Sequence, residues 1–212
     1  MGDFAAVLWD LDGTLIDSEP LWMAGEHELA ESHGSVWTQE DGLALVGNSL
    51  LESGHYIKNR LGSDLAPEEI VDFLVVRLAD ALNREIPWRP GAVELVTALD
   101  AASVPQALVT MSYAAIAQPV AKALPFAAVV TGDLVTYGKP HPEPYLRAAE
   151  QLGVDAADCL AIEDSGTGAT SANAAGCHVL VVPHFVNVPD APRRAQRTSL
   201  QDLRADGLRD MF

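Results

Sequence analysis

Two aspartates near the start of the chain have the type and spacing of catalytic or metal-binding carboxylates. Asp10 and Asp12 directly follow the apolar residues 6–9. On extended backbone, side chains two residues apart leave the same face, so both carboxylates point to one side. Acids this close raise the pKa of one of them unless a cation neutralises the pair, which indicates Mg²⁺ or a basic side chain nearby. An EF-hand is excluded, because Leu15 and Leu21 stand where its loop needs glycine and glutamate.

Three further groups of polar residues follow short apolar runs later in the chain. They are a hydroxyl group at Thr110, a lysine at Lys139 between a glycine and a proline, and a second acid pair at Glu163 and Asp164. Each group by itself also fits an ordinary turn or helix cap. Together with the first pair they supply ligands for Mg²⁺, a cation for phosphate oxygens and a nucleophile. Phosphoryl transfer requires this combination.

The apolar runs that carry these groups predict a parallel sheet. From residue 91 onward, helical patterns alternate with short apolar runs, which is typical of strand–helix–strand units. We therefore predict an α/β fold, a three-layer, doubly wound parallel sheet that includes the first run. Its ligand site would lie beyond the carboxyl ends of the strands, where all the polar groups meet. The expected strands are 106–110, 128–131, 159–162 and 179–182, and the expected helices are 91–102, 113–123, 142–152 and 167–175.

Residues 18–87 have a different pattern, with helix signals and no strand signal. Ser18 is the expected cap of their first helix, and prolines at 87 and 90 break the chain after their last. We therefore predict an all-helical cap domain of residues 18–87, inserted into an α/β catalytic core of residues 1–17 and 88–212. The proline-rich stretch 183–197 is predicted to be a surface loop.

Composition limits the partners. The formal net charge is −17 with only 13 lysines and arginines, which argues against nucleic acid as a partner. No apolar run approaches the length of a bilayer span and no apolar leader precedes the first strand, so we expect a cytoplasmic protein that binds no membrane. We also expect a monomer. Cys159 and Cys177 are too few for a disulfide framework or a zinc site.

The sequence resembles the haloacid dehalogenase superfamily of phosphohydrolases, in particular the members with a helical cap inserted after the first strand. The resemblance covers essentially the whole chain. It implies a Mg²⁺-dependent phosphatase that hydrolyses a phosphomonoester through an aspartyl-phosphate intermediate. The motifs that carry it, in the family's order, are Asp10-Leu11-Asp12-Gly13-Thr14, Thr110, Gly138-Lys139-Pro140 and Glu163-Asp164-Ser165.

The resemblance also implies a role for each motif residue. Asp10 would be the nucleophile, and Asp12 the acid that protonates the leaving alcohol and then the base that activates water. The metal ligands would be the Asp10 carboxylate, the Asp12 backbone carbonyl, Asp164 and, through a water, Glu163. The phosphate contacts would be Thr110, Lys139, the backbone N–H of Leu11, and Met111, which stands where the family has a smaller or polar residue.

The cap would close over the leaving group and exclude water, so specificity is expected there. Glu19, at the first cap junction, and Asn48, in the loop after Gly47, are the candidate substrate contacts, although each also fits a helix cap or hinge. The stretch 16–22 resembles family members that act on hexose, hexitol or 2-deoxysugar phosphates. The expected partner is therefore a small phosphorylated metabolite, a sugar or sugar-alcohol phosphate.

Other functions fit part of the pattern. A sugar phosphomutase of the β-phosphoglucomutase kind shares the fold, metal and nucleophile, but it binds a bisphosphate through basic cap residues, of which this chain has few. A phospho-aspartate receiver domain has its acids in another order and no inserted cap. A dinucleotide-binding site is disfavoured, because residues 166–171 lack the last glycine of the fingerprint. A relative that binds without catalysis stays open, although every chemical position is filled.

Overall fold

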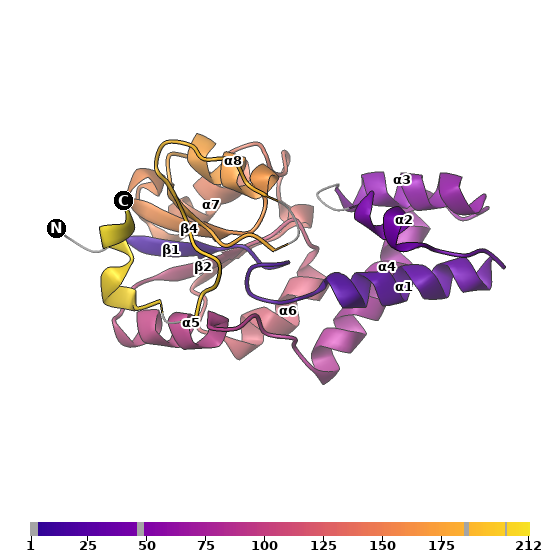
Figure 1. The fold of residues 1–212 in the computed structure, drawn as a ribbon, viewed down its shortest axis with the longest axis horizontal. Helices are drawn as coiled ribbons and strands as arrows, with labels where there is room; N and C mark the ends of the chain where they lie inside the picture. Colours follow the sequence, from indigo (N-terminus) through magenta and orange to yellow (C-terminus); the bar gives the residue numbers. More distant parts are fainter. Residues whose placement is uncertain (1–3, 46–48, 185–186, 202) are drawn as a thin grey trace.

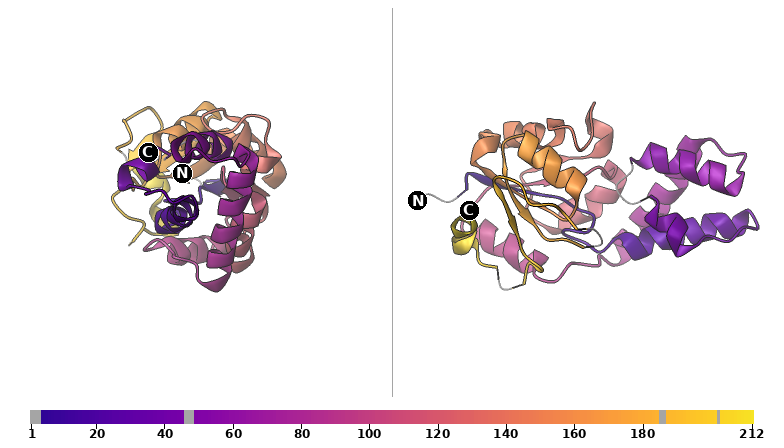
Figure 2. Two further views of the ribbon diagram at one scale, coloured as in Figure 1. Left: turned by 90° about the vertical axis from the view of Figure 1, so that its right-hand side faces the viewer. Right: turned by 45° about the horizontal axis from the view of Figure 1, so that its top comes forward.

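Two parts of the molecule lie end to end in Figure 1, an α/β part and a group of four helices. The structure is a computed structural model that describes residues 4–45, 49–184, 187–201 and 203–212. We call the four helices the helical block. They are α1 (Glu19–Ser32), α2 (Gln39–Leu43), α3 (Leu50–Leu61) and α4 (Pro67–Arg84). Figure 2 shows the block projecting from one end of the α/β part in a second view.

A six-stranded parallel sheet forms the centre of the α/β part. Its strand order is β3-β2-β1-β4-β5-β6, so β1 lies in the middle, between β2 and β4. This order confirms the predicted doubly wound α/β fold. The strands are β1 (Ala6–Trp9), β2 (Gln106–Val109), β3 (Ala128–Val130), β4 (Cys159–Glu163), β5 (His178–Val181) and β6 (Arg194–Gln196).

Helices cover both faces of the sheet and complete three layers. Along β1, Val7 and Trp9 pack in the cluster that includes helices α5 and α6, whereas Ala6 and Leu8 pack in the cluster of α7 and α8. Burial on both faces explains why this strand is apolar throughout. The helices are α5 (Ala92–Ala101), α6 (Ala114–Ala123), α7 (Glu143–Leu152) and α8 (Gly166–Ala174), with single 3₁₀ turns at Gly132–Leu134, Ala156–Asp158, Ala205–Gly207 and Arg209–Met211.

Side-chain caps account for two of the four helix starts in the helical block, those of α2 and α3. The side chains of Thr38 and Ser49 accept hydrogen bonds from backbone N–H groups at the starts of α2 and α3. Ser18 was predicted to cap α1 in the same way, and this prediction is wrong. The backbone of Ser18 is already helical, with φ −85° and ψ −13°, rather than extended as a capping residue requires. Its hydroxyl makes a different contact, described below.

Helix α4 joins the helical block to the α/β part. Val71 and Leu78 belong to the apolar cluster of Trp9 and α6, whereas Leu74 packs with the neighbouring helices of the block. The chain passes from the α/β part to the block before α1 and returns after α4. The two connecting segments lie side by side, since the Asp17 N–H donates to the Pro87 carbonyl at 2.8 Å. The domain bounds at residues 18 and 87 lie at this crossing and stay a prediction.

The end of the stretch 183–197 forms a strand that was not predicted. Its end contains β6, which pairs with β5, and the Arg194 guanidinium bonds the side-chain oxygen of Asn173 instead of forming part of a solvated patch. The loop prediction is therefore wrong for these residues, because a three-residue edge strand is too short to show an apolar alternation. None of the described helices combines the length and apolar character that crossing a bilayer would need.

Candidate active site

The carboxyl end of β1 is where the predicted polar groups meet. Asp10 follows the strand, and its backbone N–H donates to the Ile162 carbonyl of β4 at 3.0 Å. Because β1 lies between β2 and β4, its end receives Thr110 from one neighbour and Glu163 from the other. The central position of β1 in the sheet therefore assembles side chains from distant parts of the chain.

Lys139 is the cation of this site. Its ammonium donates to Asp10 Oδ1 at 2.7 Å, to Glu163 Oε1 at 2.6 Å and to the Val109 carbonyl at 3.0 Å. Burial opposes the charge, but the two carboxylates outweigh it and raise the pKa of Lys139 above its ordinary value. The lysine is therefore positively charged at neutral pH and fixes both acids.

Glu163 is fully buried, and both of its carboxylate oxygens accept hydrogen bonds. Oε1 accepts from Lys139 and, at 2.6 Å, from the Tyr145 hydroxyl, and Oε2 accepts from Ser165 Oγ at 3.1 Å. A Cβ at Gly168 would lie 1.9 Å from Oε1, so only glycine fits there. Burial, followed by Glu163, raises the pKa of Tyr145 well above its usual range, so the hydroxyl stays a donor.

Three acids form a group that fits a divalent cation. Carboxylate oxygens of Asp10, Glu163 and Asp164 lie within 4.8 Å of one another. Burial and the neighbouring acids raise the pKa of Asp10 to about 7 and that of Asp164 to about 9. Asp10 Oδ2 is buried and has no hydrogen-bond partner among the described residues. An uncompensated set of this kind, rich in oxygen ligands, suits Mg²⁺.

A tight turn at Gly13 leaves space for the Asp164 carboxylate. Gly13 has a φ of 82°, and a Cβ there would lie 2.1 Å from Asp164 Oδ2. The position therefore requires glycine both for its backbone conformation and for the space that the carboxylate occupies. The glycine of the Asp-x-Asp-Gly motif thus also makes room for Asp164, which follows β4.

The Asp12 carboxylate accepts hydrogen bonds from three hydroxyl groups. Ser18 Oγ donates to Asp12 Oδ1 at 2.6 Å, and Ser112 Oγ and Thr110 Oγ1 donate to Oδ2 at 2.7 and 3.3 Å. Ser18 directly precedes α1, so this contact joins the site to the start of the helical block. Asp12 is therefore held at the side of the site that faces the block.

Residues 4–176 match the family model of haloacid dehalogenase-like hydrolases. The chain belongs to this family. The hydrolase is 36% identical over 197 residues to hexitol phosphatase A of Escherichia coli (strain K12), which covers 88% of this chain and 85% of that protein. The predicted family is thereby confirmed. The predicted enzyme class, a phosphatase, is confirmed as well and agrees with the name of this relative.

Solved structures with the same fold cover nearly the whole hydrolase. CbbY from Rhodobacter sphaeroides, in complex with phosphate, has a TM-score of 0.82 and 24% identity, with 94% of this chain and 96% of that chain covered. β-Phosphoglucomutase from Clostridium difficile has a TM-score of 0.78 and 19% identity, with 98% and 96% covered. Both likenesses support the fold of the hydrolase.

The remaining predicted site residues take up less central positions. The Leu11 side chain is buried in the core, and the Met111 sulfur accepts a hydrogen bond from the Lys139 backbone N–H at 3.2 Å. Glu19 is half-buried, and its pKa is raised by burial and then by Asp17 and Asp12. Asn48 lies outside the described residues.

Sequence reasoning missed three residues of the hydrolase site. Ser18 and Ser112 hold Asp12, and Tyr145 holds Glu163. The available signal for Tyr145 was a large polar aromatic residue in the first turn of the helix that follows the lysine motif. For Ser112 the signal was its position two residues after Thr110, and for Ser18 it was its position next to the candidate substrate contact Glu19; both are weak signals.

Proposed function

We propose that the hydrolase is a Mg²⁺-dependent phosphatase that releases phosphate from a sugar or sugar-alcohol phosphate through an aspartyl-phosphate on Asp10. One observation carries the proposal. The Asp10 carboxylate is oriented by Lys139 on Oδ1, while the buried Oδ2 has no hydrogen-bond partner among the described residues. No described donor therefore competes with a ligand for that oxygen, which is the requirement for an acid that must bind metal and attack phosphorus.

Asp10, Asp164 and the backbone carbonyl of Asp12 would hold the Mg²⁺. Glu163 would act through a water, because Lys139, Tyr145 and Ser165 occupy its carboxylate oxygens. When bound, Mg²⁺ supplies positive charge that offsets the phosphate and lowers the pKa values of the acids that contact it. All of these groups come from one chain, which supports a monomer as the active form.

The reaction has two steps on the chain's own side chains. In the first, an Asp10 oxygen forms a bond to phosphorus, the ester bond breaks, and Asp12 gives its proton to the leaving oxygen. In the second, Asp12 takes a proton from a water whose oxygen attacks phosphorus, and the Asp10–phosphorus bond breaks. Lys139 and Thr110 would bind the phosphate oxygens throughout.

We also propose that the helical block, with the predicted bounds 18–87, is the cap that covers the leaving group. The contact between Ser18 and Asp12 supports this role, because it ties the start of α1 to the proton donor. A cover at this point would exclude water while the first step takes place.

The charges of the block favour the phosphatase over a sugar phosphomutase, which must hold a second phosphate. Three of the block's four basic side chains bond within the block: Lys58 to the Leu65 carbonyl, Arg60 to Asp41 and Arg77 to Glu28. The fourth, Arg84, is exposed in the last turn of α4. A bisphosphate would thus find few free cations in the block.

The test is phosphate release from a panel of sugar and sugar-alcohol phosphates, measured with Mg²⁺ and after its removal with EDTA. We expect Mg²⁺-dependent release that falls at least about 10⁴-fold in Asp10→Asn, because the nucleophile is lost. Asp100→Asn, an exposed change at the end of α5, is the control and should keep full activity. Isomerisation of β-glucose 1-phosphate in the presence of a bisphosphate, without phosphate release, would establish the mutase instead.

A further inference from the structure

Acidic side chains border the site where α1 leaves the α/β part. Ser18, which donates to Asp12, stands between Asp17 and Glu19 in the sequence, so both acids are neighbours in the chain of a residue that contacts the proton donor of the proposed reaction. Glu19 is half-buried, and burial followed by Asp17 and Asp12 raises its pKa. In the proposed function the phosphoryl group would be placed by Lys139 and by the buried Asp10 Oδ2, which has no hydrogen-bond partner among the described residues.

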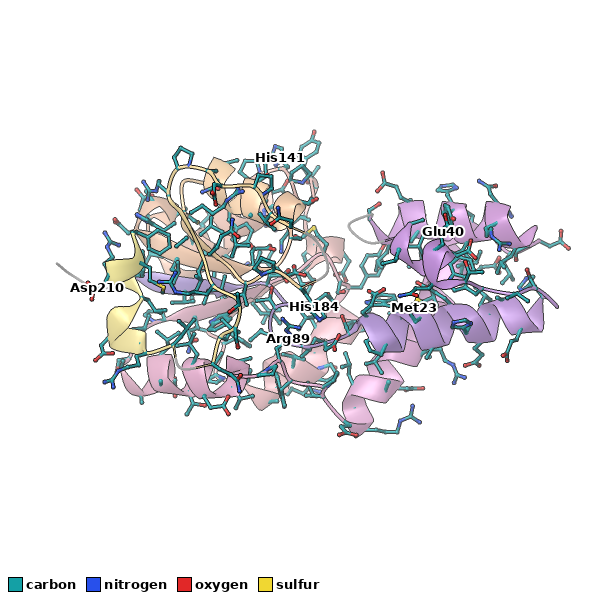
Figure 3. The ribbon with its side chains drawn as sticks, in the orientation of Figure 1. Met23, Glu40, Arg89, His141, His184 and Asp210 are labelled. Carbon is teal, nitrogen blue, oxygen red and sulfur yellow. The ribbon has the colours of Figure 1, made fainter. Side chains whose placement is uncertain are left out.

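The geometry of α1 directs Glu19 toward the site. Glu19 shares a helix face with Met23 and Glu26, one and two turns further on. A Cβ at Gly42 of α2 would lie 2.2 Å from the Met23 sulfur and 3.4 Å from Glu26 Oε2, so α2 covers these two residues. Figure 3 shows Met23 between α1 and the helices above it. Glu19 lies beyond that cover, at the end of the face nearest the α/β part.

The basic side chains around this region are engaged elsewhere. Lys139 is bound to Asp10 and Glu163, and the block's Lys58, Arg60 and Arg77 bond within the block. Arg89 lies on the α/β part, close to His184, whose pKa it helps to lower. Asp17 Oδ1 lies 3.9 Å from His184 Nε2, whereas no basic side chain contributes to the pKa shift of Glu19.

We propose that the hydrolase selects esters whose leaving group carries no negative charge, and that Glu19 imposes this selection. The inference rests on the proposed phosphatase function, in which the leaving group lies beside Asp12. An anionic leaving group would meet the Glu19 carboxylate or force it to take up a proton, and both cost free energy. A hydroxyl-rich leaving group can instead donate hydrogen bonds to that carboxylate, and a cationic one is attracted to it.

Three open-chain esters of matched size test the inference. Glucitol 6-phosphate is neutral at its far end, 6-phosphogluconate carries a carboxylate there, and 1-amino-1-deoxyglucitol 6-phosphate carries an ammonium. We expect kcat/KM for the gluconate ester to be at least about tenfold below that for the glucitol ester, as charge repulsion in a partly buried site predicts. The amino ester should be hydrolysed at least as well as the glucitol ester.

Variants assign the selection to one residue. Glu19→Gln keeps the size of the side chain and removes its charge, so it should narrow the gap between the glucitol and gluconate esters several-fold. Glu31→Gln removes an exposed charge from the other end of α1 and should leave the gap unchanged. An unchanged gap in Glu19→Gln would overturn the role of Glu19.

Two failures are distinguishable. If wild-type enzyme hydrolyses the gluconate and glucitol esters equally well, the charge selection is wrong while the phosphatase function stands. If no phosphate is released from these esters or from p-nitrophenyl phosphate with Mg²⁺, the proposed function itself is overturned, and the charge selection with it.

Discussion

Acidic side chains are buried in both parts of the hydrolase, and the two parts stabilise them differently. At the edge of the sheet, Asp10 and Glu163 share the ammonium of Lys139. In the helical block, Glu26 is only 5% exposed, and its Oε2 accepts a hydrogen bond from the Trp37 indole N–H at 2.8 Å. Burial raises the pKa of Glu26 to about 7, and no basic side chain contributes to that shift.

The difference separates an acid that must stay charged from one that need not. A neutral donor such as the Trp37 indole stabilises a carboxyl group whether or not it carries a proton. A buried lysine favours the charged form and opposes the burial and the neighbouring Glu163 that raise the pKa of Asp10 to about 7. Asp10 Oδ2 in addition has no hydrogen-bond partner among the described residues, which costs stability and serves no packing purpose. The kind of partner, more than burial alone, therefore indicates which acid takes part in chemistry.

Among changes to the partners of the buried acids, the largest effect is expected from Lys139→Met, which removes the cation that the two acids share. We predict that kcat/KM falls about 10³-fold, because phosphate oxygens and Asp10 lose their positive partner. The free energy of unfolding should fall by about 3 kcal/mol, because two buried acids lose the cation that they share. Steady-state kinetics with p-nitrophenyl phosphate and urea denaturation measure the two effects.

Lys122→Met is the matched control, since Lys122 is exposed near the end of α6. It should change neither activity nor stability appreciably. If the activity of Lys139→Met stayed within tenfold of wild type, catalysis would not depend on this lysine. The proposed difference between the acids at the sheet edge and Glu26 would then be wrong.

A smaller effect is expected from Tyr145→Phe, which removes one of the donors to Glu163 Oε1. Tyr145 acts through Glu163 and Lys139, so we predict a roughly tenfold fall in kcat and a higher Mg²⁺ concentration for half-maximal activity. The KM for the ester should change little. Tyr137→Phe, at a tyrosine that is 60% exposed, is the control and should behave as wild type. An unchanged Mg²⁺ dependence in Tyr145→Phe would contradict this role and would mean that Tyr145 contributes only to packing.

The sequence was most informative where structure is local and repeated. Alternating helices and apolar runs were sufficient to predict the parallel sheet, and the ends of parallel strands necessarily meet at one edge. Asp10, Lys139, Glu163 and Asp164 are close together for that reason. Their catalytic roles stay proposals.

Contacts that depend on how elements are rotated or bent could not be predicted. Ser18 meets Asp12 only because the chain turns back before α1, and Tyr145 meets Glu163 only because α7 presents that face to β4. The three residues of β6 carry no periodic pattern of their own. In each case the geometry depends on how the chain turns and packs between the two partners, which a local pattern does not encode.

The smallest effect, and the sharpest test of the contrast, is expected from Glu26→Gln. The pKa of Glu26 is about 7 in the folded protein and 4.5 ordinarily, so between these pH values the folded form holds a proton that the unfolded chain has released. This group's contribution to stability is therefore lost as the pH rises from about 4.5 to 7. Glutamine removes the loss and still accepts from Trp37, so we predict equal stability at pH 4.5 and a gain of roughly 2 kcal/mol at pH 8.

Urea denaturation of both proteins between pH 4.5 and 8 measures the gain, with Glu31→Gln as the control that should show none. A gain of the same size at every pH would come from packing, and it would contradict the assignment of the effect to a proton. Activity should stay within threefold of wild type in Glu26→Gln, whereas the equivalent change at Asp10 removes activity. The same kind of substitution, acid to amide, would then stabilise the protein at Glu26 and inactivate it at Asp10, because only Asp10 needs its charge.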